Sequence, residues 1–153
     1  MRLYLVQHAD AVDASVDPER PLSPKGGRDA RTLAEACARY RLQAVEVIHS
    51  GKARARETAE TLAEALNLPV RAEAGLDPLD PVEPFARECA ARRSTIVVGH
   101  LPFLERLAAK LLTGREDPPV LAFQRGGMTC LERRADAWCL LWTAFPDQVH
   151  LGG

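Results

Sequence analysis

The sequence predicts an α/β protein, a three-layer α/β/α sandwich with a mostly parallel sheet and an antiparallel hairpin at its carboxyl-terminal edge. Two observations predict this class. Short apolar runs alternate with longer amphipathic segments, the pattern of strands that are connected through helices. Near the end of the chain, two β-rich segments follow each other directly, as in a hairpin. The length of 153 residues suits one hydrophobic core, so residues 1–153 are predicted to form a single domain.

The first predicted unit is a strand, a long loop and a helix. The run from Arg2 to Val6 is mainly apolar and meets a polar stop, which is typical of a buried parallel strand. His8 stands at the carboxyl end of that strand. After a loop that contains prolines, Ser23 and Pro24 provide an N-cap and a first-turn proline for a helix.

The second unit repeats this order. Residues 44–49 form a strand candidate, and a Ser-Gly pair at 50–51 interrupts it. Residues 53–66 are rich in alanine, glutamate and leucine and therefore predict a helix. Arg54 lies near the amino end of this helix.

The third unit follows a short connection. Residues 70–72 are predicted as a short edge strand, and a proline-rich loop leads into a helix around 85–92. Residues 95–99 form the clearest strand of the chain, and His100 follows it directly. Pro102 then opens another amphipathic helix.

The hairpin is predicted from residues 128–133 and 138–144, which are separated by a short polar turn. Parallel sheets bind their ligands beyond the carboxyl ends of the strands. His8 and His100 both stand at such ends, so the two side chains share one crevice if their strands are neighbours.

Composition narrows the range of partners. The chain has 20 lysines and arginines against 21 acidic residues, a formal net charge of -1. This balance offers no broad basic surface, and we expect neither nucleic acid nor a membrane among the partners. The four cysteines lack a C-x-x-C pair, which favours reduced thiols and a cytoplasmic protein. Cys130 and Cys139 fall on the two arms of the hairpin, where a disulfide is the less favoured alternative.

Two histidines and an arginine suit the chemistry of a phosphoryl group. Its hydrolysis requires cations or N–H donors around the equatorial oxygens and an aligned nucleophile. His8 can attack through one ring nitrogen if the other donates its proton to a backbone carbonyl. His100 can donate to a phosphoryl oxygen, and Arg54 offers a guanidinium beside the free N–H groups of a helix start. His49 also ends a strand, but no basic motif surrounds it, so we expect a structural role for it.

Four runs carry a resemblance to a known family. They are LVQHA at 5–9, RPLS at 20–23, SGKARARET at 50–58 and VVGHLP at 97–102. In this order they resemble the histidine phosphatase superfamily, and most closely its small phosphohistidine phosphatase branch, the SixA-like proteins. The resemblance implies a phosphoglycerate mutase-like fold and a metal-independent hydrolase. It also implies that His8 is transiently phosphorylated and that Arg54 and His100 bind the phosphoryl group.

The first of these runs departs from the family pattern. The family has Arg-His-Gly where this chain has Gln7, His8 and Ala9, so a neutral amide replaces a guanidinium. Gln7 can still donate hydrogen bonds, but the loss of one charge-assisted contact costs on the order of 2–4 kcal/mol in the transition state. Such a loss slows an enzyme about 10²- to 10³-fold. Arg20 is the predicted partial compensation, so Gln7, Arg20 and Arg54 form the expected substrate-binding set.

The acid assistance that a leaving group needs indicates the class of substrate. Four carboxylates lie where larger family members place a general acid, but their spacing singles out none of them: Glu73, Asp77, Asp80 and Glu83. An imidazole, which titrates near about 6.5, leaves more easily than an alkoxide and needs less acid assistance. The resemblance therefore implies hydrolysis of phosphohistidine on a partner protein of the phosphotransfer type, in signal transduction.

Two other functions remain open. Because of Gln7, the pocket is also compatible with a phosphate- or phosphoprotein-binding module without turnover. A phosphatase for a small phosphorylated molecule is the other alternative. No cofactor is expected, and the histidines and carboxylates lack the spacing of zinc or magnesium sites.

Overall fold

A six-stranded sheet runs through the computed structural model, which describes residues 1–151, with the strand order β3-β2-β4-β1-β5-β6. The first four strands in this order are mutually parallel, whereas β5 is antiparallel to β1 and β6 is antiparallel to β5. The elements are β1 (Arg2–Gln7), α1 (Pro24–Arg39), β2 (Glu46–His49), α2 (Ala53–Leu66), β3 (Val70–Ala72), α3 (Glu83–Cys89), β4 (Thr95–Gly99), α4 (Phe103–Thr113), β5 (Met128–Arg134), β6 (Ala137–Ala144) and α5 (Pro146–Leu151). The predicted α/β class and the antiparallel edge hairpin are confirmed.

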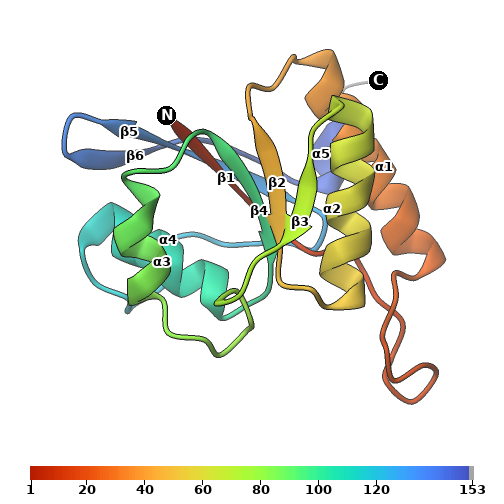
Figure 1. Ribbon diagram of the computed structural model, residues 1–153. Helices are drawn as coiled ribbons and strands as arrows, with labels where there is room; N and C mark the ends of the chain where they lie inside the picture. The colour runs from red at the N-terminus through yellow and green to blue at the C-terminus, as the bar shows by residue number, and fades with distance from the viewer. Residues whose placement is uncertain (152–153) are drawn as a thin grey trace.

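Helices cover both faces of the sheet. Figure 1 shows α1, α2 and α5 on one side, and α3 and α4 on the other. The central strand β1 alternates between these layers: Tyr4 and Val6 pack in the core under α1 and α2, whereas Leu3 and Leu5 pack in the core under α3 and α4. All four side chains are buried, which explains why this strand reads as a continuous apolar run.

The start of α1 is held against the loop that follows His8. The hydroxyl of Ser23 accepts a hydrogen bond from the backbone N–H of Gly26 at 3.0 Å, so the predicted N-cap is confirmed. A Cβ on Gly26 would lie 1.9 Å from the carbonyl oxygen of Asp10. Only glycine permits this approach, and the contact fixes the loop close to the carboxyl end of β1.

The boundaries of several elements differ from the predictions. The helix predicted around 85–92 spans Glu83–Cys89 and carries Pro84 in its first turn, where proline is tolerated. The strand predicted over 44–49 is shorter and begins at Glu46. Helix α5 was not predicted, although Pro146 starts it and an acidic residue follows in its first turn.

The hairpin excludes a disulfide between its cysteines. Cys130 pairs with Trp142 across the strands, and Cys139 pairs with Glu132, so the two sulfurs belong to different cross-strand pairs. All four cysteines are free. No helix within residues 1–151 has the length and apolarity needed to cross a lipid bilayer.

Candidate active site

The register of β1 and β4 brings two histidines together. Gln7 pairs with Gly99 in this parallel ladder, so His8 and His100 leave neighbouring strands at the same level. The backbone N–H of His8 donates to the carbonyl of Gly99 at 3.0 Å. The centroids of the two imidazole rings are 5.1 Å apart. Residues 92 positions apart in the sequence thus lie close together beyond the carboxyl ends of β1 and β4, two strands that Figure 1 shows side by side.

The backbone fixes the tautomer of His8. Nδ1 lies 2.8 Å from the carbonyl oxygen of Ala9, which accepts only from an N–H, so Nδ1 carries the proton and Nε2 has the free lone pair. Burial lowers the pKa of His8 to about 4, and the positive charges of Arg54, Arg125 and Arg20 act in the same direction. The ring is therefore neutral at pH 7, and its Nε2 is free to act as a nucleophile.

His100 faces the hydroxyl of Ser50. Its Nε2 lies 2.6 Å from Ser50 Oγ, whereas its Nδ1 is buried without a hydrogen-bond partner among residues 1–151. The pKa of His100 is lowered to about 3, mainly by burial and in addition by the neighbouring His8 and Arg54. An anion bound between these cations would raise the pKa again, because negative charge favours the imidazolium.

Arg54 lies in the first turn of α2. That turn contains no acidic residue and its N-cap residue makes no side-chain hydrogen bond, so the positive end of the helix dipole is left for a ligand. Burial lowers the pKa of Arg54, and the charges of Arg20 and Arg125 add to this effect. Its Nε is buried without a hydrogen-bond partner in the described chain. Thr58, one turn later, connects α2 to the first motif by accepting from the N–H of Ala9 at 3.1 Å.

Gln7 and Arg20, the other two predicted binding residues, lie in different surroundings. The Oε1 atom of Gln7 is buried and has no hydrogen-bond partner within residues 1–151. Arg20 lies in the loop after β1, where its Nε donates to the carbonyl of Val12 at 3.1 Å. Its charge contributes to the lowered pKa values of both His8 and His100. Arg20 therefore adds to the positive field of the site.

Three side chains near this cluster were not assigned roles from the sequence: Ser50, Thr58 and Arg125. Ser50 stands at the end of β2, the kind of position where ligands bind, and this signal could have identified it. Arg125 has no such signal, because it precedes β5 in an irregular segment. It reaches the cluster through an ion pair with Asp10, in which Nη1 and Oδ1 are 3.0 Å apart.

The structure separates the four candidate carboxylates. Glu73 pairs with Arg92, and Glu83 pairs with Lys110, so both are engaged away from the histidines. Asp80 accepts from the backbone N–H of Asp77 at 2.8 Å. Asp77 alone among them acts on the site, since its charge raises the pKa of Arg54.

His49 takes part in local structure. It is buried, and its Nδ1 accepts the backbone N–H of Gly51 at 3.0 Å, directly after β2. The ring thus stabilises the turn that leads into α2. No group of three or more histidine, cysteine or acidic side chains among residues 1–151 is arranged to hold a metal ion.

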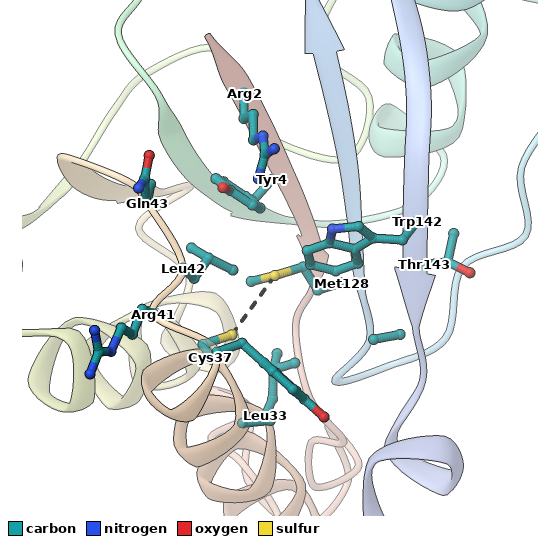
Figure 2. A pocket seen from close by; sticks show the side chains of 13 residues that line it. Arg2, Tyr4, Leu33, Cys37, Arg41, Leu42, Gln43, Met128, Trp142 and Thr143 are labelled. Carbon is teal, nitrogen blue, oxygen red and sulfur yellow. Dashed lines mark hydrogen bonds between the residues drawn. The ribbon is translucent and has the colours of Figure 1, made fainter. Parts of the chain in front are cut away.

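A cavity of about 620 Å³ lies on a different part of the molecule. Figure 2 shows Leu33, Cys37, Met128 and Trp142 around it, from α1, β5 and β6. Its wall shares no residue with the histidine cluster. We therefore assign the chemistry to the carboxyl edge of the sheet, where the two histidines and Arg54 lie, and not to this cavity.

Taken together, the cluster consists of two neutral imidazoles surrounded by guanidinium groups and a helix amino terminus. One imidazole has a free lone pair in a fixed direction, and the neighbouring cations repel one another. A dianion with three equatorial oxygens satisfies these donors and relieves the repulsion. The arrangement is suited to nucleophilic attack on a phosphoryl group.

Comparisons with known proteins identify relatives of this chain. The sequence profile of the histidine phosphatase superfamily (branch 1) matches residues 3–83. The phosphohistidine phosphatase SixA of Escherichia coli is 32% identical over 131 residues, which cover 78% of this chain and 79% of that protein.

Solved structures show the same fold. A structure of the protein histidine phosphatase SixA complexed with tungstate aligns with a TM-score of 0.83 at 26% identity, covering 96% of this chain and 98% of the other. The structure of a phosphohistidine phosphatase SixA candidate from Nakamurella aligns with a TM-score of 0.69 at 28% identity, covering 95% of each chain.

Proposed function

The chain belongs to the histidine phosphatase superfamily and is a phosphatase, and from this premise we propose that it hydrolyses phosphohistidine on a protein through a phospho-His8 intermediate. The roles follow the geometry. His8 is the nucleophile, and His100 and Arg54 bind the phosphoryl oxygens. Gln7 and Arg20 complete the binding set. No metal takes part in this scheme.

The observation that carries the proposal is the hydrogen bond from His8 Nδ1 to the carbonyl of Ala9 at 2.8 Å. Because this bond fixes the proton on Nδ1, the lone pair of Nε2 is available for attack. The ring of His100 lies beside it, with the two centroids 5.1 Å apart, so both rings can contact the same phosphoryl group. An imidazole whose role was only structural would not need a free nitrogen beside three cations.

Two displacements at phosphorus complete the reaction. In the first, the substrate ring carries a proton on its other nitrogen, Nε2 of His8 forms a bond to phosphorus, and the phosphorus–nitrogen bond of the substrate breaks to release a neutral imidazole. In the second, water attacks phospho-His8, phosphate leaves, and His8 returns to its neutral form. His100 and Arg54 stabilise the equatorial oxygens in both steps.

Phosphohistidine is the substrate that suits this site. The leaving imidazole has a low basicity, so the reaction does not depend on a strong acid near the scissile bond. Asp77, the one candidate carboxylate that acts on Arg54, is about half exposed. The relatives named above as phosphohistidine phosphatases support the same substrate class, and with it a role in signalling through phosphorylated proteins. The free cysteines fit a reducing cytoplasm.

Trapping of the labelled intermediate tests the proposal. Wild-type protein is mixed with a protein phosphorylated on histidine with radioactive phosphate and is quenched in alkali, in which phosphohistidine survives. We expect label on the wild type and on a His49→Asn control, and none on His8→Ala. A labelled His8→Ala protein, or an unlabelled wild type that still releases phosphate, would contradict the mechanism.

A binding module is the second candidate, and Gln7 is the observation that favours it, because its buried Oε1 replaces a charged donor with an acceptor. Calorimetry distinguishes the two functions. Binding of a phosphohistidine peptide without release of phosphate over hours would select the module. A substrate panel that includes sugar phosphates tests the third candidate, a phosphatase for small phosphoesters, which predicts faster turnover of those compounds than of phosphohistidine.

A further inference from the structure

Arg125 lies beside the position where the first motif lacks its arginine. We propose that Arg125 supplies to the phosphoryl group the guanidinium that Gln7 cannot supply. This inference rests on the function proposed above. It assigns a binding role to a residue that no motif of the sequence singles out.

The backbone holds Arg125 in place. The N–H of Gly126 donates to the carbonyl of Gln7 at 3.0 Å, so the segment before β5 is bonded to the end of β1. Gly126 has a φ of +77°, which favours glycine. A Cβ on Gly126 would lie 3.8 Å from the Cβ of Ala9, so there is ordinary packing contact with the motif on this side. Arg125 therefore begins next to the residues on both sides of His8.

Asp10 orients the guanidinium. One carboxylate oxygen of Asp10 lies 3.0 Å from Nη1 of Arg125, and the other accepts the hydroxyl of Ser23 at 2.6 Å. Ser23 is itself fixed as the N-cap of α1. A guanidinium has five N–H donors, and the bond to Asp10 uses one of them. The remaining donors can bind phosphoryl oxygens, and the side chain is 53% exposed, so an incoming substrate can reach it.

The charge of Arg125 acts on the reacting groups. It contributes to the lowered pKa values of both His8 and Arg54, together with the charge of Arg20. Gln7 contributes no charge to this field. Arg20, the compensation expected from the sequence, donates its Nε to the carbonyl of Val12. Arg125 donates one Nη to the carboxylate of Asp10, which leaves the other donors of its guanidinium for a dianion.

A double-mutant cycle tests whether Arg125 and residue 7 perform the same task. Arg125→Ala is made in the natural background and in the Gln7→Arg background, and kcat/KM is measured with a phosphohistidine protein. We expect a loss of about 10²-fold in the natural background, as for one oxyanion donor, and of less than about tenfold in the Gln7→Arg background. Arg39→Ala, at the far end of α1, is the matched control and should leave kcat/KM unchanged.

Equal losses in the two backgrounds would overturn the proposal. Two further variants distinguish binding from a structural role. Arg125→Lys should keep activity within about tenfold of the natural protein, because it retains the charge, whereas Arg125→Gln should lose as much as Arg125→Ala. Asp10→Asn keeps an oxygen that can accept from Nη1 of Arg125, so it should lose less activity than Arg125→Ala, and an equal loss would overturn the proposal because the ion pair itself would be the cause.

Calorimetry with inorganic phosphate separates this inference from the proposed function. Arg125→Ala should weaken phosphate binding at least about tenfold in the natural background, even if the protein proves to hydrolyse no phosphohistidine. A natural protein that binds phosphate but does not turn over substrate would overturn the proposed function alone. Unchanged phosphate affinity in Arg125→Ala would overturn the role of Arg125 alone.

Discussion

The carboxyl edge of the sheet and the cavity beside α1 differ in the kind of side chain that they bury. At the edge, His8 and His100 are buried next to cations, and Arg54 has a buried Nε without a partner among residues 1–151. In the cavity, Cys37 and Met128 are buried next to other apolar groups, with their sulfur atoms 3.9 Å apart. Within residues 1–151, the edge thus gathers several unpartnered polar atoms, whereas the cavity wall has one, the buried hydroxyl of Tyr4.

Burial keeps both His8 at the edge and Cys37 in the cavity wall neutral, but it shifts their pKa values in opposite directions. It lowers the pKa of His8 to about 4 and raises the pKa of Cys37 to about 12. At the edge, the surrounding positive charge adds to this effect and is complementary to an anion. In the cavity, burial is the cause of the shift at Cys37. We infer that the buried polar groups of the edge lower the free energy of unfolding but enable the binding of an anion. The packing around the cavity affects only the free energy of unfolding.

Removal of the charge of Arg54 should give the largest effect and would sharpen this comparison. Arg54→Met keeps the aliphatic packing but removes the guanidinium that we propose binds the phosphoryl group, so kcat/KM should fall about 10²- to 10³-fold. The free energy of unfolding should rise by up to about 1 kcal/mol, because a cation in the first turn of a helix opposes the helix dipole. Phosphate-release kinetics and urea unfolding measure the two quantities. A large loss of stability would contradict the trade-off.

Enlargement of the cavity should lower the free energy of unfolding and leave kcat/KM nearly unchanged, the opposite of the result expected for Arg54→Met. Leu33→Ala removes a buried wall residue and should lower the free energy of unfolding by about 3 kcal/mol. The kcat/KM of the folded protein should remain within about twofold of the natural value. Leu79→Ala is the control, since Leu79 is 81% exposed and its removal should change neither quantity. A catalytic defect in Leu33→Ala would show that the two regions are coupled.

Acid should lower the free energy of unfolding through the histidines of the edge and not through the thiols of the cavity wall. The pKa values of His8 and His100 are about 4 and about 3 in the folded chain, below the ordinary 6.5, so the unfolded chain binds protons first as the pH falls. The stability that the neutral rings contribute is full above about pH 6.5 and is lost progressively below it. Each histidine should add about 1.4 kcal/mol per pH unit to the slope of stability against pH between about 6 and 5.

Unfolding of the natural protein and of a His8→Asn, His100→Asn double variant at several pH values measures this contribution. The variant should show a shallower slope. An unchanged slope would mean that the two histidines do not carry the acid sensitivity. The thiols of Cys37 and Cys130, with pKa values raised by burial to about 12 and about 11, do not titrate in this range.

Filling of the cavity should give the smallest effect. Cys37→Leu adds apolar volume to a wall that borders open space, and we expect a gain of about 1 kcal/mol in the free energy of unfolding. Thermal unfolding measures it, with kcat/KM as the second readout. A loss of stability would indicate that α1 and β6 cannot accept the larger side chain.

The elements of the fold that depend on local signals were predictable from the sequence. Ser23 caps α1 as predicted, and the strand at 95–99 and the helix at 53–66 have the expected boundaries. Each of these depends on neighbours within a few residues, through side-chain period, a cap or a break. Short elements such as α3 and α5 gave weaker signals, and their boundaries or existence were missed.

The sequence by itself determined which residue types were available for the chemistry, and where along the strands His8 and His100 stand. Only the tertiary structure decided which groups meet. The pairing of Asp10 with Arg125 joins positions 115 residues apart, and that of Ser50 with His100 joins positions 50 apart. Such pairs follow from strand order, sheet register and the packing of loops, which depend on the whole chain, so no local period or spacing encodes them.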